Sequence, residues 1–262
     1  EEKLDSYIKN TYEEILVLGK KLNRIENLPT DNETFYHDFE EKFRGSRELI
    51  KERLQIYVPI LKEKLQDWSK ARFVDIGSGR GEWLDILREN GAIDYIGVDL
   101  NAQQNELSEK YGHHTVQMDC IKYLLEQPNS SVDLITGFQI IEHLYMSDLM
   151  KLLKESYRVL KPGGVILFET PNPKNLIVGA NTFYIDPSHI RPLVPETVSF
   201  LVEWCGYSNV KCIDVNSHQN SIKTEVLKWN ESKDEMHLLQ EFNDIKWNLY
   251  GPQDYAVIGT KE

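Results

Sequence analysis

The sequence has few cysteines and no long apolar run, and these absences exclude several classes of protein. Its three cysteines, Cys120, Cys205 and Cys212, cannot all pair with one another, and none has the C-x-x-C spacing of a zinc site. We therefore expect buried free thiols and a reducing, cytoplasmic setting. No apolar stretch approaches the roughly 18–20 residues that a membrane span needs, and no signal-peptide pattern opens the chain.

The net charge has the wrong sign for a general nucleic-acid partner. A formal charge of −12 lacks the basic surface that binds phosphate backbones. The 262 residues are enough for one α/β domain with appended elements. Because the chain starts at "EEKL" without methionine and ends at "GTKE", we expect it to be a piece of a longer protein.

Two helical segments are predicted before the main domain. Residues 1–28 carry a heptad-like stripe, which suits either a helix packed on its own domain or one that forms homo-oligomers. Residues 35–69 are predicted to form a helical cap. Its apolar face comprises Phe39, Phe43, Ile50, Leu54, Tyr57, Leu61 and Leu65.

From residue 70 to residue 262, short β-branched runs alternate with helical patterns. Strand–helix alternation with nearly continuous apolar strands predicts βαβ units and a parallel sheet that is buried on both faces. We expect an α/β, Rossmann-like, seven-stranded, mostly parallel sheet whose last two strands form a reversed hairpin at one edge. The expected strands start at or near residues 72, 94, 115, 132, 164, 208 and 254.

A glycine-rich stretch, "DIGSGRGEW" at residues 75–83, follows directly on the first of these strands. In an open parallel sheet the ligand lies beyond the carboxyl ends of the strands, where glycines let the backbone approach it closely. Asp99 follows Gly81 by eighteen residues and ends the second strand, where its carboxylate can accept from both hydroxyls of a ribose. This much suits a dinucleotide or a nucleoside.

Two acids favour a particular nucleoside. Asp75 precedes the glycines, where it is badly placed for a pyrophosphate but well placed for an ammonium group. Asp119 ends the third strand, where it can accept from an adenine amino group while Met118 and Cys120 pack near the ring. Ribose, adenine and a cationic amino-acid end together indicate S-adenosylmethionine.

The segments "VDIGSGRGEW", "GVDLN", "QMDC", "IIEHL" and "LKPGG", in this order, resemble the class I S-adenosylmethionine-dependent methyltransferases over roughly residues 70–260. The resemblance implies that the glycine loop lines the methionine part of the cofactor, Asp99 and Leu100 the ribose, and Asp119 and Cys120 the adenine. The implied loop residues are Gly77, Ser78, Gly79 and Gly81. We also assign Trp83, Phe138 and Gln139 to the cofactor site, and Tyr36 and Arg53 to a lid; Arg44 and Arg47 are weaker candidates.

The acceptor is expected at "TGFQIIEHL" (136–144) and at the loop 172–196, which we expect to lack regular secondary structure. His143 has the pKa range of a general base, although a structural histidine is the alternative. Tyr184, Asp186 and His189 crowd between prolines in the loop, where an Asp–His pair can form. We assign these four residues to the catalytic site.

Three segments narrow the resemblance further: residues 35–57, residues 169–196 and the terminal "LYGPQDYAVIG". They are similar to methyltransferase domains of bacterial surface-polysaccharide assembly, including O-antigen chain-terminating enzymes. This implies a glycan or sugar-phosphate acceptor and peripheral association at the inner face of the membrane.

Three alternatives remain open. A metal-assisted methyltransferase would use Gln139, Glu142, His143 and His189, but Gln139 stands where a carboxylate is needed, so we expect no metal. A small-molecule O-methyltransferase, as in quinone biosynthesis, shares "EHL". A catalytically silent scaffold would use the fold and its N-terminal heptads without turnover.

Overall fold

The computed structural model describes residues 42–43, 45–217 and 233–262, and residues 47–262 form one compact unit. The heptad-like helix predicted for residues 1–28 and the lid residue Tyr36 lie outside the described residues. The candidate Arg44 also lies outside them, and the other predicted site residues lie inside.

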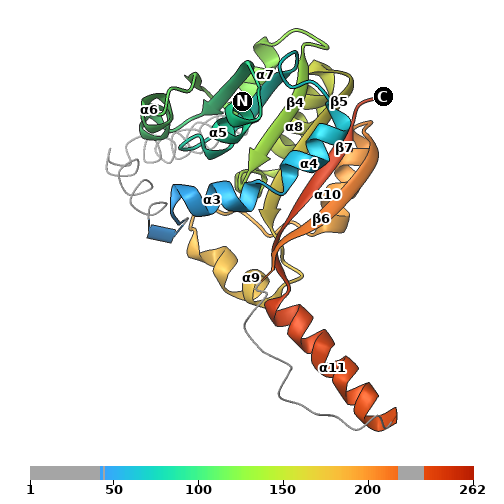
Figure 1. Cartoon of the computed structure of the whole chain (residues 1–262). Helices are drawn as coiled ribbons and strands as arrows, with labels where there is room; N and C mark the ends of the chain where they lie inside the picture. Colours follow the sequence, from blue (N-terminus) through green and yellow to red (C-terminus); the bar gives the residue numbers. More distant parts are fainter. Residues whose placement is uncertain (1–41, 44, 218–232) are drawn as a thin grey trace, which may run out of the picture. The chain divides into compact units, whose positions relative to one another are not determined.

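A seven-stranded sheet confirms the predicted fold class (Figure 1). Its order is β3-β2-β1-β4-β5-β7-β6, with parallel pairing from β3 to β5 and antiparallel pairing of β7 with both β5 and β6. The strands are β1 (Arg72–Ile76), β2 (Asp94–Asp99), β3 (Thr115–Gln117), β4 (Val132–Phe138), β5 (Leu160–Pro171), β6 (Ser208–Ser217) and β7 (Pro252–Thr260). Since strand order reverses between β1 and β4, the loops after these strands flank the switch point where ligands bind.

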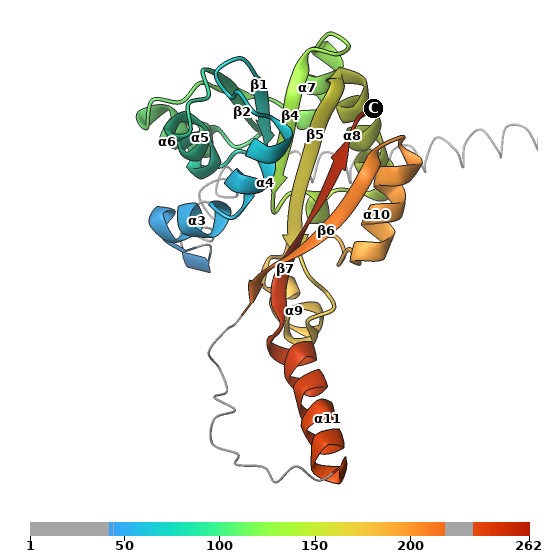
Figure 2. The ribbon, with the colours of Figure 1, turned by 45° about the vertical axis from the view of Figure 1, so that its right-hand side comes forward.

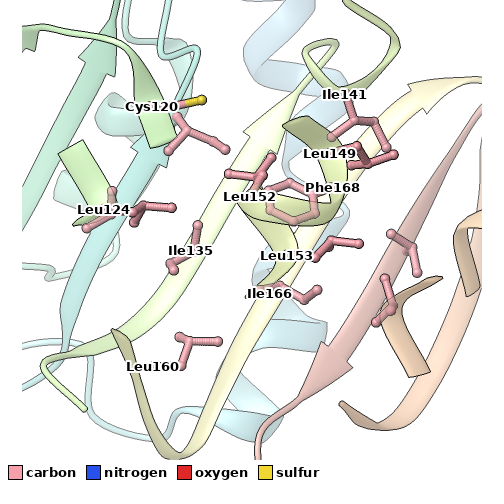
Figure 3. Packing of buried hydrophobic residues seen from close by; sticks show 14 of the residues in the cluster. Cys120, Leu124, Ile135, Ile141, Leu149, Leu152, Leu153, Leu160, Ile166 and Phe168 are labelled. Carbon is pink, nitrogen blue, oxygen red and sulfur yellow. The ribbon is translucent and has the colours of Figure 1, made fainter. Parts of the chain in front are cut away.

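Helices cover both faces of the sheet, and the views in Figures 1 and 2 agree on this arrangement. One hydrophobic cluster joins the sheet to α7, α8 and α10, and a second joins the opposite face to α3, α4 and α5. Figure 3 shows the first cluster, in which Leu152 and Leu153 of α8 pack on Ile166 and Phe168 of β5. The helices are α3 (Arg47–Leu54), α4 (Tyr57–Lys64), α5 (Glu82–Glu89), α6 (Ala102–Lys110), α7 (Cys120–Glu126), α8 (Met146–Val159), α9 (Leu176–Ala180), α10 (Pro195–Trp204) and α11 (Lys233–Tyr250).

The segment predicted as a helical cap contains two helices, α3 and α4, in its described part. The break falls at Gln55–Ile56 because Pro59 has no N–H to donate to the Gln55 carbonyl, and its ring would clash with that oxygen. The predicted apolar face is confirmed for Leu54, Tyr57 and Leu61, which are buried in the second cluster.

The prediction that residues 172–196 lack secondary structure is wrong. They contain α9 and the 3₁₀ helix η2 (Thr182–Ile185). Asn175 stabilises α9 because its side-chain oxygen accepts from the N–H groups of Ile177 and Val178, at 3.0 and 3.2 Å. Strand β5 also starts at Leu160 instead of Gly164, since Leu160 already pairs with Val132.

The three cysteines are free thiols, as expected, but they differ in burial. Cys120 is buried, Cys205 is partly buried and Cys212 is exposed, so the expectation of burial holds only for the first. Burial raises the pKa of the Cys120 thiol to about 12, which keeps it protonated beside the third strand. Across residues 42–43, 45–217 and 233–262, no helix combines the length and apolarity that a membrane crossing requires.

Candidate active site

The glycine loop joins β1 to α5 at the carboxyl edge of the sheet. Gly77, Gly79 and Gly81 have φ angles of +63°, +50° and +79°, which residues with a side chain adopt only under strain. A Cβ at Gly77 would lie 2.6 Å from Cδ1 of Ile140, so this glycine also lets the loop approach the segment after β4. The glycines thus lie directly after β1, as predicted, with backbone angles that favour glycine, and their contact with a ligand stays a prediction.

An arginine from α3 fastens this loop from outside. Arg47 donates to Oδ2 of Asp85 from Nε at 3.1 Å and from Nη2 at 2.6 Å, and it also donates to the carbonyls of Arg80 and Gly81. Burial alone would raise the pKa of Asp85, but the hydrogen bonds and charge of Arg47 outweigh burial and lower it. Arg47 therefore holds the loop, a role that the sequence analysis did not distinguish from cofactor binding.

Two carboxylates stand at the ends of β2 and β3, as predicted. Asp99 accepts from the N–H of Gly79 at 2.9 Å and from that of Asn101 at 2.8 Å, which ties the glycine loop to β2. Leu100 beside it is 65% exposed, so it offers an apolar surface next to Asp99. Asp119 caps α7 by accepting from the N–H of Lys122 at 2.9 Å. The two acids are thus fixed at one edge of the sheet.

Asp75, Trp83 and Phe138, which were assigned to the cofactor site, are buried. Asp75 is 2% exposed and accepts from Oγ1 of Thr136 at 2.7 Å. Trp83 and Phe138 are buried in the second cluster with ring centroids 5.2 Å apart. Direct contact of any of these side chains with the cofactor stays a prediction.

Gln139 lies at the end of β4 and bridges two acids that sequence reasoning missed. Its φ is +56°, and its Nε2 donates at 3.1 Å to both Glu169 and Asp254. Burial raises the pKa of Glu169 to about 7, and burial also raises the pKa of Asp254. Arg53 of α3 is exposed, and its positive charge partly offsets the effect of burial by lowering the pKa of both acids. The signal in the sequence was a lone acid in each of two apolar strands.

The predicted acceptor end contains a compact cluster of one carboxylate and two imidazoles. Glu142, His143 and His189 each offer a nitrogen or oxygen within 4.8 Å of the other two. Nε2 of His189 lies 3.8 Å from Oε1 of Glu142, and the two imidazole centroids are 4.7 Å apart. The N–H of Ile190 donates to the Glu142 carbonyl at 3.0 Å, which joins the loop to the 3₁₀ helix η1 (Ile141–His143).

Asp186 and Ser188 contact the two imidazoles. Ser188 Oγ lies 2.6 Å from Oδ1 of Asp186 and 2.9 Å from Nδ1 of His143. Asp186 Oδ2 lies 3.9 Å from Nε2 of His189, so the predicted Asp–His pair forms as a loose contact. Tyr184 is 63% exposed and packs on Phe183, whose ring in turn lies 4.5 Å from that of His189, centroid to centroid.

Glu142 is the most deeply buried member of the cluster. It is 0% exposed; Thr170 donates to its Oε2 at 2.8 Å, whereas its Oε1 has no hydrogen-bond partner among the described residues. Burial raises the pKa of this carboxyl to about 8. A buried polar atom without a hydrogen-bond partner is uncommon, and it singles out Oε1 of Glu142 as a candidate functional atom.

The residues at the glycine loop fit S-adenosylmethionine. Gly77 has no room for a Cβ, and Ser78 Oγ is buried without a hydrogen-bond partner among the described residues. Asp99 has the chemistry to accept from the ribose hydroxyls, and Asp119 stands where the adenine amino group is expected. When bound, the cofactor supplies a methyl group that its sulfonium already activates.

The fold and this edge define the class: a class I S-adenosylmethionine-dependent methyltransferase domain. Residues 43–242 match the family described as a methyltransferase domain, and the chain belongs to that family. A solved S-adenosylmethionine-dependent methyltransferase from Archaeoglobus fulgidus is 36% identical, with a TM-score of 0.76, and the match covers 87% of this chain and all of that one.

Curated relatives match the chain over shorter spans. A probable S-adenosylmethionine-dependent methyltransferase from Mycolicibacterium smegmatis is 40% identical over 135 residues, which is 51% of each chain. A ubiquinone biosynthesis O-methyltransferase from Coxiella burnetii is 27% identical over 177 residues, covering 58% of this chain and 69% of the relative. This chain thus spans about half the length of the first of these relatives.

Proposed function

We propose that the protein transfers the methyl group of S-adenosylmethionine to an oxygen of its acceptor. The observation that carries this proposal is the cluster of Glu142, His143 and His189 at the carboxyl edge of the sheet. An oxygen acceptor such as a hydroxyl must lose its proton as it attacks the methyl group, and imidazole groups are suited to that task near neutral pH.

The cluster is well built for accepting a proton or holding an acceptor oxygen. Phe183 O can only accept, so the 2.6 Å contact places a proton on Nδ1 of His189, and in the neutral imidazole the lone pair is then on Nε2. His143 stands next to it on η1, directly after β4. The ring orientations are therefore fixed by oxygen atoms behind them, as catalytic imidazoles require.

The acceptor class that we propose is the terminal sugar or sugar phosphate of a bacterial surface polysaccharide, with capping of O-antigen as the specific case. Its support is the sequence resemblance of residues 169–196 and one feature of Arg191. Nε and Nη2 of Arg191 are buried and have no hydrogen-bond partner among the described residues. A guanidinium with unused donors suits a phosphate or carboxylate group on the acceptor.

A small-molecule O-methyltransferase is the second candidate, and the ubiquinone biosynthesis O-methyltransferases among the relatives favour it. Methylation of maltotriose, glucose 6-phosphate and catechol, followed with radiolabelled cofactor, separates these acceptor classes. Transfer to the sugar phosphate alone supports a phosphoglycan, and transfer to catechol alone supports the second candidate. Cofactor binding without transfer to any of them would support a silent scaffold.

Calorimetric titration with S-adenosylmethionine tests the cofactor site itself. Asp99→Ala removes the carboxylate that would accept from the ribose and should weaken binding by about 10- to 100-fold, since a hydrogen bond to a charged group contributes about 1.5–3 kcal/mol. Asp94→Ala, at the exposed opposite end of β2, is the matched control and should bind like wild type. Equal affinities of Asp99→Ala and wild type would refute the assignment.

The turnover test uses His143→Ala on whichever acceptor is methylated. It should leave cofactor affinity nearly unchanged while lowering turnover at least about 100-fold, the lower end of general-base contributions. Unchanged turnover would remove His143 from the catalytic site and leave His189 or a phosphate acceptor as the explanation.

A further inference from the structure

At the predicted site of the methyl acceptor, a buried carboxylate oxygen faces an imidazole but forms no hydrogen bond with it. Glu142 is 0% exposed, and its Oε1 has no partner among the described residues. The nearest imidazole nitrogen, Nε2 of His189, lies 3.8 Å away, which is too long for a hydrogen bond. The separation is close to the roughly 3.3 Å between two ligand atoms of one tetrahedral metal ion.

The imidazoles are oriented as metal ligands are. Nδ1 of His189 lies 2.6 Å from the carbonyl of Phe183, which cannot donate, so Nδ1 carries the proton. Ser188 Oγ donates a hydrogen bond to Oδ1 of Asp186 at 2.6 Å. It therefore accepts one from the N–H at Nδ1 of His143 at 2.9 Å. Metal-binding histidines characteristically donate the N–H of their second ring nitrogen to a carboxylate, a backbone carbonyl or water. His189 donates to a carbonyl, and His143 donates to a hydroxyl that is itself bonded to a carboxylate.

We propose that Glu142, His143 and His189 bind one divalent transition-metal ion of the zinc type. Two imidazoles and one carboxylate are a donor set for zinc, cobalt(II) or iron(II), whereas magnesium and calcium prefer oxygen donors alone. Three protein ligands leave a coordination position open, as in catalytic zinc sites. An ion there would use the free lone pair of each imidazole, so neither histidine would serve as a base while the ion is bound. That an acceptor oxygen occupies the open position rests on the proposed function, but metal binding does not.

The geometry needs only a small adjustment to close on an ion. Bonds of roughly 2.0–2.1 Å to a tetrahedral ion place donor atoms roughly 3.3 Å apart. The donors here lie 3.8 Å apart for one pair and within 4.8 Å for all three, so binding an ion would require them to approach one another by about 0.5–1.5 Å. The N–H of Ile190 on the Glu142 carbonyl holds the two contributing segments together.

The sequence predicted no metal because Gln139 stands where a carboxylate is needed, but in the structure Gln139 is not part of the proposed ligand set. Gln139 turns its amide to Glu169 and Asp254 and takes no part in the cluster. His189, forty-six residues beyond His143, supplies the third ligand, so the missing carboxylate at position 139 is not needed.

The experiment measures metal binding alone, on the full chain treated with chelator, without cofactor or acceptor. Titration with Co²⁺, read by its visible d–d absorption, and with Zn²⁺, read by calorimetry, should show one ion per chain. His143→Ala and His189→Ala should each weaken binding at least 100-fold. His114→Ala, which changes an exposed histidine at the start of β3, is the matched control and should bind like wild type.

Ser188→Ala keeps the test valid if the other variants fold poorly, because Ser188 is exposed and its hydroxyl links His143 to Asp186 without being a proposed ligand. It should weaken Co²⁺ binding by about 10- to 100-fold while the melting temperature stays that of wild type. Absence of ion binding by wild type, or wild-type affinity in both histidine variants, would overturn the proposal. If metal binds but no oxygen acceptor is methylated, the proposed function fails and the metal site stands.

Discussion

Replacing Glu142 by glutamine should stabilise the metal-free protein at neutral and alkaline pH. The side chain is fully buried, and its pKa is raised from 4.5 to about 8 by burial. A raised folded-state pKa means that this group favours folding below the unfolded pKa and loses that contribution as pH rises towards the folded value. Between pH 4.5 and 8, folding must therefore either protonate the carboxyl or bury its charge.

The size of the effect follows from the two pKa values. At pH 7 the carboxyl is ionised in the unfolded chain and protonated in the folded protein. At 1.36 kcal/mol per pH unit above the unfolded pKa of 4.5, taking up this proton lowers the free energy of unfolding by on the order of 3 kcal/mol. Glutamine has no such cost, and its oxygen can still accept from Oγ1 of Thr170. The stability advantage of Glu142→Gln should therefore be small at pH 4 and reach on the order of 3 kcal/mol at pH 7.

Urea unfolding from pH 4 to pH 9 in the presence of a chelator measures this difference. Glu106→Gln, which changes an exposed carboxyl on α6, controls for the loss of one negative charge and should show no comparable rise. A difference between Glu142→Gln and wild type that stays flat across this pH range would refute the reasoning, because the carboxyl would then titrate alike in both states.

Two further predictions concern the glycine loop. Gly77→Ala should lose cofactor affinity, because its φ of +63° strains a residue with a Cβ by about 1–2 kcal/mol and the new atom meets Ile140. Gly91→Ala, with φ of +92° and no atom within 4 Å, carries only the backbone strain and should bind cofactor normally in calorimetry; equal losses would contradict this account. Arg47→Gln should lower the free energy of unfolding by about 1.5–3 kcal/mol in urea. Lys154→Gln, at an exposed position of α8, is the control and should change it by less than about 0.5 kcal/mol. An effect of Arg47→Gln no larger than that of the control would show that Arg47 does not stabilise the loop.

The fold was readable from the sequence because its strands are short apolar runs and its helices are regularly patterned. Strand β1 and the glycines after it were predicted almost to the residue, since both rest on local requirements of burial and backbone conformation. The structure within residues 172–196 was missed. There α9 depends on Asn175, whose side chain caps the helix and also donates to the Gly251 carbonyl at 3.0 Å, seventy-six residues away.

At the candidate site, too, residues placed by local sequence were predicted and residues paired over long distances along the chain were not. Asp99 and Asp119 follow directly from the rule that parallel strands end at a common edge, and both lie where predicted. The roles of Arg47 and Gln139 did not follow, because their partners Asp85, Glu169 and Asp254 are between 30 and 115 residues distant along the chain. No local pattern encodes such a pairing.

The sequence by itself determined the sheet, the glycine loop and the class of cofactor, because these depend on residue type and spacing along a few consecutive residues. Only the tertiary structure decided that Glu142 and His143, after β4, meet His189 from the far side of a long loop. The physical reason is that donors become a site only when packing brings their lone pairs to one point, and here that packing includes the Ile190 N–H on the Glu142 carbonyl.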